Sequence, residues 1–86
     1  MAGRTIIDIQ DVFSIEGSGE VAVVILKGGV LRLGMKAILN GKEAEVVSIE
    51  SGGKVLDSFS TIGGKAGVLL RGVNKSDITL GGIIFT

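Results

Sequence analysis

The chain has 86 residues, of which 45% are hydrophobic and only 3% are aromatic. Nine basic and nine acidic residues give a formal net charge of zero, which argues against binding driven mainly by phosphate neutralisation. The lack of Cys and His excludes disulfides and thiolate metal sites, and it removes the commonest general base, so we expect no cofactor. The length predicts a single domain over residues 1–86.

Extended structure is predicted for most of the N-terminal half. Residues 4–9 and 12–15 have apolar side chains in extended patterns, and Gly17-Ser18-Gly19 predicts a turn. Residues 20–27 (EVAVVILK) form the strongest predicted strand, because they are almost continuously apolar and rich in β-branched side chains. Such a run is typical of a strand buried on both faces or in a barrel wall.

A β-hairpin is predicted in the middle of the chain. Residues 35–39 and 42–49 flank Asn40-Gly41, and both of these turn residues tolerate a positive φ. In the second strand the acidic side chains of Glu43 and Glu45 share one face, whereas Ala44 and Val46 share the other. We therefore expect this strand to be half exposed.

The C-terminal third is predicted to end in two strands, residues 66–71 and 82–86. Between them, Asn74 and Ser76 are candidate helix caps, which predict one turn of irregular or helical structure. Residues 55–62 are ambiguous. About seven short strands, without a helical apolar period of twelve or more residues, predict an all-β barrel or sandwich.

No catalytic arrangement is predicted. Residues 17–22 match the letters of the dinucleotide-binding fingerprint, but a strand follows them where that motif requires a helix. The serines and the nearby carboxylates lack a partnering base or nucleophile, so we expect no enzymatic activity. The longest apolar run, residues 21–26, is too short to cross a bilayer, and we expect a cytoplasmic protein without a membrane partner.

Two motifs resemble one family. The closing stretch AGVLLRGVNKSDITLGGIIF, residues 66–85, resembles the end of the second, β-barrel domain of translation elongation factor Tu and its relatives. Residues 11–19, DVFSIEGSG, resemble the family's D-V-F-[ST]-I-x-G-R-G, and Gly34 falls at the family's glycine spacing after that triplet. The resemblance covers about residues 6–86. It implies a small closed antiparallel β-barrel of six or seven strands, corresponding to that domain alone, without the GTPase domain and therefore without GTP.

In that family the barrel helps to hold the aminoacyl end of tRNA and faces the small ribosomal subunit. By the resemblance, Asp11 and Phe13 match pocket positions, Val21 matches an apolar one, and Glu50 matches an acidic position beside the terminal adenosine. Other matched positions have changed residue type. Gln10 stands where Glu is common, Ser18 replaces the arginine of the turn, and Lys65 stands where Asn is usual. The candidate RNA-binding residues are therefore Gln10, Asp11, Phe13, Gly17, Ser18, Gly19, Val21, Glu50 and Lys65.

The resemblance implies a non-enzymatic binding module with a weak tRNA or rRNA contact and a role linked to translation. An alternative is that Phe13 and Val21 only fill the barrel interior. A second alternative is an adaptor or assembly barrel with a protein partner and no nucleic-acid ligand. An exposed apolar patch at Val23, Val24 and Ile25 would favour this adaptor.

Overall fold

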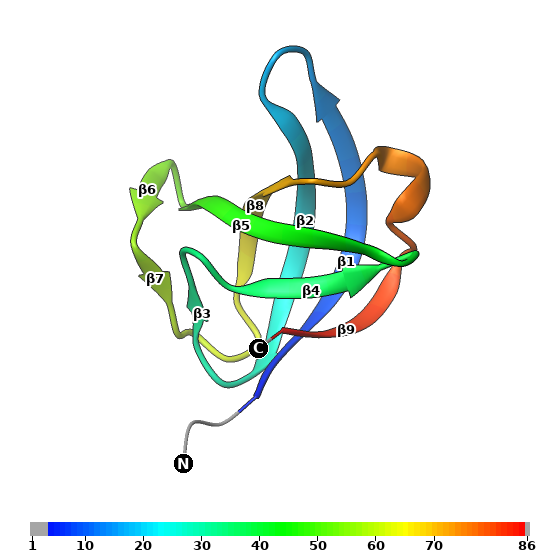
Figure 1. Cartoon of the computed structure of the whole chain (residues 1–86). Helices are drawn as coiled ribbons and strands as arrows, with labels where there is room; N and C mark the ends of the chain where they lie inside the picture. Colours follow the sequence, from blue (N-terminus) through cyan, green and yellow to red (C-terminus); the bar gives the residue numbers. More distant parts are fainter. Residues whose placement is uncertain (1–3, 86) are drawn as a thin grey trace.

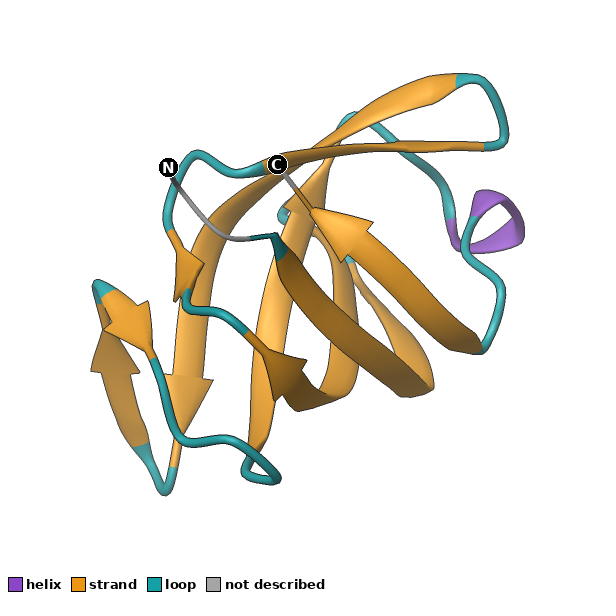
Figure 2. Cartoon of the chain, turned by 90° about the horizontal axis from the view of Figure 1, so that it is seen from below, coloured by secondary structure: helices purple, strands orange, loops and turns teal. Residues whose placement is uncertain are grey.

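An antiparallel sheet that curls into a nearly closed barrel dominates the computed structural model, which describes residues 4–85 (Figures 1 and 2). The strand order in this sheet is β4-β5-β8-β2-β1-β9, and β6 pairs with β5 beside β4. These strands are β1 (Thr5–Ile15), β2 (Gly19–Gly28), β4 (Lys36–Leu39), β5 (Lys42–Ser51), β6 (Lys54–Leu56), β8 (Lys65–Arg71) and β9 (Gly81–Phe85). The predicted small antiparallel barrel of six or seven strands is confirmed. Within the described residues, however, no backbone pairing joins β9 to β4, so the barrel has a seam.

A two-stranded ribbon lies beside the barrel, formed by β3 (Leu31–Arg32) and β7 (Ser58–Phe59). Leu31 and Phe59 face each other across the ribbon, and both are buried in the single core cluster. The ambiguous segment 55–62 thus becomes part of β6, all of β7 and the following turn. Within residues 4–85, no helix is long and apolar enough to cross a membrane.

Alternation along β2 builds the core. Ala22, Val24 and Leu26 are buried, whereas Val21, Val23 and Ile25 lie on the outer face of the wall and are half-buried. Val24 is buried, so the apolar patch that would favour an adaptor is reduced to the half-buried Val23 and Ile25, because successive side chains of a strand point to opposite faces.

Two of the register shifts between strands are β-bulges that change this alternation in β1 and β5. In β1 the register skips Gln10 between Ile9 and Asp11, so the buried positions change from Ile7 and Ile9 to Val12. In β5 the register skips a residue between Val46 and Ser48, so Ile49 is the next buried residue. An extra residue in one strand has this effect because side chains alternate with a period of two. The bulges therefore turn Asp11, Phe13, Ser48 and Glu50 outwards.

The hairpin and the helical turn follow their sequence signals. Asn40 and Gly41 have φ values of 53° and 77°, and β4 pairs with β5 around them. Ala44 and Val46 are buried as predicted. The turn between β8 and β9 is the 3-10 helix η1 (Lys75–Asp77), with Asn74 at its N-cap.

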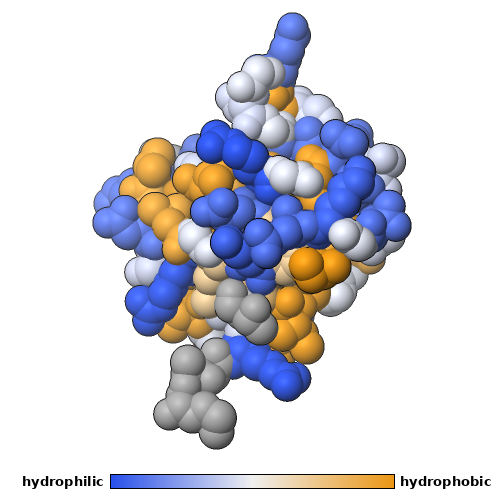
Figure 3. Space-filling model, viewed as in Figure 1, coloured by the Kyte–Doolittle hydropathy of each residue, from blue (hydrophilic) through white to orange (hydrophobic). Residues whose placement is uncertain are grey.

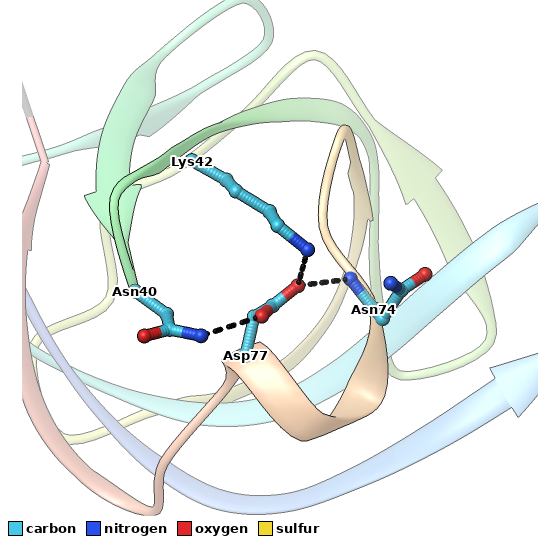
Figure 4. A network of polar contacts seen from close by, with 4 residues as sticks. All are labelled: Asn40, Lys42, Asn74 and Asp77. Carbon is cyan, nitrogen blue, oxygen red and sulfur yellow. Dashed lines mark hydrogen bonds and ion pairs between the residues drawn. The ribbon is translucent and has the colours of Figure 1, made fainter.

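A buried carboxylate ties η1 to this hairpin (Figure 4). Asp77 Oδ1 accepts a hydrogen bond from Asn40 Nδ2 at 2.8 Å. Its Oδ2 accepts one from the Asn74 backbone N–H at 2.8 Å and one from Lys42 Nζ at 3.0 Å. These contacts, the Asn40 hydrogen bond foremost, lower the pKa of Asp77 from 3.8 to about 2.

Replacement of Leu70 by Ala should lower the free energy of unfolding by about 2–5 kcal/mol, because it leaves a cavity at a fully buried position. Replacement of its half-buried neighbour Leu69 by Ala should cost about 1 kcal/mol. Urea unfolding with an unchanged m-value measures both. Equal losses would contradict the assignment of these two side chains to opposite faces of β8.

Asp77 should make the stability depend on pH. Its pKa is depressed in the folded state, so its contribution is complete above the ordinary value of 3.8 and is lost as the pH falls towards about 2. Asp77→Asn should therefore lower the urea midpoint at pH 7 and flatten its fall across this window. The exposed-residue variant Asp57→Asn is the control and should leave the pH 7 midpoint unchanged. An Asp77→Asn curve parallel to the wild type would contradict the prediction.

Candidate nucleic-acid interface

Rows of side chains cross the outer face of the barrel wall. Phe13 lies opposite Val21, Val21 opposite Leu69, and Leu69 opposite Ser48. The next row runs from Asp11 through Val23 and Gly67 to Glu50. Four strands thus contribute to one continuous face. The bulges in β1 and β5 are the reason that its two margins carry Asp11, Phe13, Ser48 and Glu50.

A hollow of about 270 Å³ lies on this face. Ile15, Val21 and Leu69 give it an apolar lining, and Ser18, Ser48 and Glu50 supply polar groups. Gly67 completes the lining, and a Cβ built on it would make ordinary contacts, 3.7 Å from Val21 Cγ1 and 3.9 Å from the Glu50 carbonyl oxygen. The missing side chain at Gly67 therefore leaves open space within the wall.

The structure brings three of the predicted site residues together at this hollow, namely Ser18, Val21 and Glu50. Phe13 is adjacent through its pairing with Val21, and its side chain is 50% exposed. The alternative that Phe13 and Val21 fill the barrel interior is wrong, because Phe13 is exposed and Val21 is half-buried on the outer face.

The other predicted residues lie outside the lining of the hollow. The exposed Asp11 accepts a hydrogen bond at Oδ1 from the Val12 backbone N–H at 2.8 Å. Gln10, at the bulge, donates from Nε2 to Asp8. Lys65 is exposed at the start of β8, where its carbonyl oxygen accepts a hydrogen bond from Ser51 Oγ.

The two glycines of the β1–β2 turn have conformational roles. Gly17 and Gly19 have φ values of 79° and 136°, which favour glycine. A Cβ on Gly19 would also lie 2.8 Å from the Leu70 carbonyl oxygen. These residues therefore shape the turn that carries Ser18 to the edge of the hollow.

Four lining residues were not among the sequence candidates, namely Ile15, Ser48, Gly67 and Leu69. Only Gly67 carries a sequence signal, because a glycine inside a strand often marks a close approach or an open space. Ile15 and Leu69 look like ordinary strand residues, and the outward position of Ser48 depends on the bulge.

The charged side chain in the lining of the hollow is acidic. It is Glu50, and Asp11 lies in the adjoining row. Lys65 is paired with Ile25, further along the same face. This arrangement favours an uncharged or hydrogen-bond-donating group in the hollow over a phosphate.

The sequence relatives of this chain are translation elongation factors. No family model matches the chain. Elongation factor 1-alpha of Pyrobaculum calidifontis is 40% identical over 78 residues, which cover 88% of this chain and 17% of that protein. Elongation factor 1-alpha of Saccharolobus solfataricus is 41% identical over 80 residues, which cover 91% of this chain and 18% of that protein. The chain thus spans less than a fifth of the length of these curated relatives.

A solved structure confirms the fold. The apo form of translation elongation factor SelB from Methanococcus maripaludis superposes with a TM-score of 0.82, over 98% of this chain and 19% of that one, at 21% identity. The sequence matches and the shared barrel together confirm the resemblance inferred from residues 11–19 and 66–85. The chain is a homologue of the β-barrel domain of elongation factor Tu and its relatives among the translation factors.

Proposed function

We propose that this translation-linked barrel is a non-catalytic binding module that holds the end of an RNA strand at the hollow on its outer face. One observation carries the proposal: an apolar floor of Val21 and Leu69 lies beside the polar groups of Ser18, Ser48 and Glu50. A terminal nucleoside likewise has apolar and polar parts side by side. Its base has flat apolar faces and polar edges, and its ribose carries hydroxyl groups.

The contacts would be of two kinds. The base would lie against the aliphatic side chains of Val21 and Leu69, with Phe13 as the neighbouring aromatic group. The Glu50 carboxylate and the Ser48 hydroxyl would accept hydrogen bonds from ribose hydroxyls or from an exocyclic amino group. Because the charged side chain in the lining of the hollow is the acidic Glu50, the binding energy would come mainly from base and sugar, and affinity for general RNA would be weak.

A non-catalytic role agrees with the chemistry present. Ser18 and Ser48 are the hydroxyl groups of the hollow, and the chain has no His to activate them. Among residues 4–85, no group of three or more acidic, Cys or His side chains is arranged to hold a metal ion. A cytoplasmic location follows from the proposed role in translation.

A protein partner is the second candidate for this face. Phe13, Ile15 and Val55 are exposed by 50%, 49% and 78%. Ile15 lines the hollow, Phe13 pairs with Val21, and Val55 pairs with Glu50. Apolar side chains around a hollow are also typical of protein contacts, which depend less on salt than phosphate contacts do.

RNA binding should be visible by NMR when a CCA trinucleotide is added to the labelled protein. We expect shift changes at Val21, Ser48, Gly67 and Leu69, because these residues line the hollow. The affinity should fall by less than about threefold between 50 and 200 mM salt, since at most one phosphate would be contacted. An aminoacylated tRNA end, tested in parallel, should shift the same residues.

Gly67→Ala tests the site directly. The added methyl narrows the hollow, so we expect CCA affinity to fall about tenfold, while stability stays equal or rises by about 0.5–1 kcal/mol. Ile62→Ala, which removes an exposed side chain outside the hollow, is the matched control and should bind normally. If CCA shifts none of the lining residues in a folded protein, the RNA proposal fails and the protein-partner candidate takes its place.

A further inference from the structure

The seam of the barrel leaves two strand edges without a backbone partner. β4 pairs only with β5, and β9 pairs only with β1, within the residues that the structure describes. Both edges are short, with four and five residues. Because β4 and β9 are the two ends of the strand order and β2 and β8 are at its middle, the seam and the RNA candidate face lie on different sides of the barrel.

Three exposed isoleucines gather along the seam. Ile38 is 67% exposed, Ile84 is 48% exposed and Ile6 is 40% exposed. Ile6 and Ile84 are directly paired across β1 and β9, and Ile38 lines the same hollow as Ile84. Figure 3 shows apolar surface over this region of β4 and β9. At strand edges, soluble proteins usually have charged side chains, or a helix or loop that covers the edge, in place of exposed branched aliphatic side chains.

The seam has an exposed side chain, Ile38, and a hollow close together. The hollow has a volume of about 330 Å³ and is lined by Lys36, Ala37, Ile38, Glu43 and Ile84. Ile38 is one of its lining residues and is the most exposed of the three isoleucines. A protruding side chain next to a hollow of this size is complementary to a second copy of the same surface.

The charges of the seam are also self-complementary. Lys36 Nζ and Glu43 Oε1 are 3.6 Å apart, and their side chains are 52% and 59% exposed. A two-fold axis that passes through this part of the seam would place Lys36 of one copy beside Glu43 of the other. The formal net charge of zero adds no long-range repulsion between copies.

We propose that two copies of this chain associate through their β4–β9 seams. The contact is isologous, so each Ile38 enters the hollow beside Ile84 in the other copy, and Lys36 and Glu43 pair reciprocally between copies. The apolar part consists of three partly exposed isoleucines, well below the roughly 800 Å² per partner of a standard stable interface. The dimer is therefore weak and depends on concentration.

Sedimentation equilibrium of the full chain between about 10 µM and about 1 mM tests the association, since a weak contact has a Kd in this range. The mean mass should rise from the monomer value of 8.8 kDa towards twice that value. Ile38→Lys should abolish the rise, because it places a charge in the apolar contact. Val55→Lys is the matched control, since Val55 is 78% exposed and lies on β6 outside the seam.

Charge reversal separates the seam from any other self-contact. Lys36→Glu makes this charge pair wholly acidic and Glu43→Lys makes it wholly basic, so each variant alone should stay monomeric. An equimolar mixture should associate again, because the opposite charges then meet only between copies. A wild type that stays monomeric at the highest concentration, a mixture that stays monomeric, or an equal loss in Val55→Lys would each overturn the proposal. Circular dichroism verifies that every variant retains its β structure.

Discussion

Two extra residues, one in β1 and one in β5, decide which side chains this barrel offers to its surroundings. The wall alternates between core and surface with a period of two, so each bulge exchanges the two faces for the rest of its strand. Without the β1 bulge, the alternation that buries Ile7 and Ile9 would direct Asp11 and Phe13 into the core. Without the β5 bulge, Ser48 and Glu50 would follow Ala44 and Val46 inwards. Burial of a carboxylate without a partner is costly, so the bulges are needed for folding as well as for the outer face.

The core and the outer face are therefore two sides of one wall. β2 contributes Ala22, Val24 and Leu26 to the interior and Val21, Val23 and Ile25 to the exterior, and its nearly continuous apolar sequence serves both. The outer side chains are half-buried because neighbouring strands cover part of them. Gly67 interrupts this cover at one position, where it leaves space between Val21 and Glu50. The missing side chain at Gly67 thus adds to the space of the hollow, and the backbone there needs no positive φ.

Sequence reasoning succeeded where the signal was local. Asn40-Gly41 specified the hairpin because few other residue pairs adopt two successive positive φ values, and Asn74 marked the short helical turn. The family motifs then supplied the barrel, although the unpaired seam between β4 and β9 was not foreseen. Ser18, Val21 and Glu50 converge on the hollow, but the outward direction of Phe13 and Ser48 could not be read from sequence. A bulge is defined by the pairing of two strands distant in the chain, so no short window contains it.

One cluster of polar contacts links the two edge strands of the barrel sheet at the seam. Asp77 binds Asn40 and Lys42 at the tip of the β4–β5 hairpin, and η1 leads from β8 to β9. The hairpin and the start of the last strand are therefore held together through side chains, at the place where the ladder has no backbone pairs. Such a link fixes the two edges as neighbours but leaves their outward isoleucines uncovered. A small barrel closed in this way keeps an apolar strip at its seam, and the adjacent Lys36–Glu43 pair supplies the charges of both signs that the proposed contact between two copies needs.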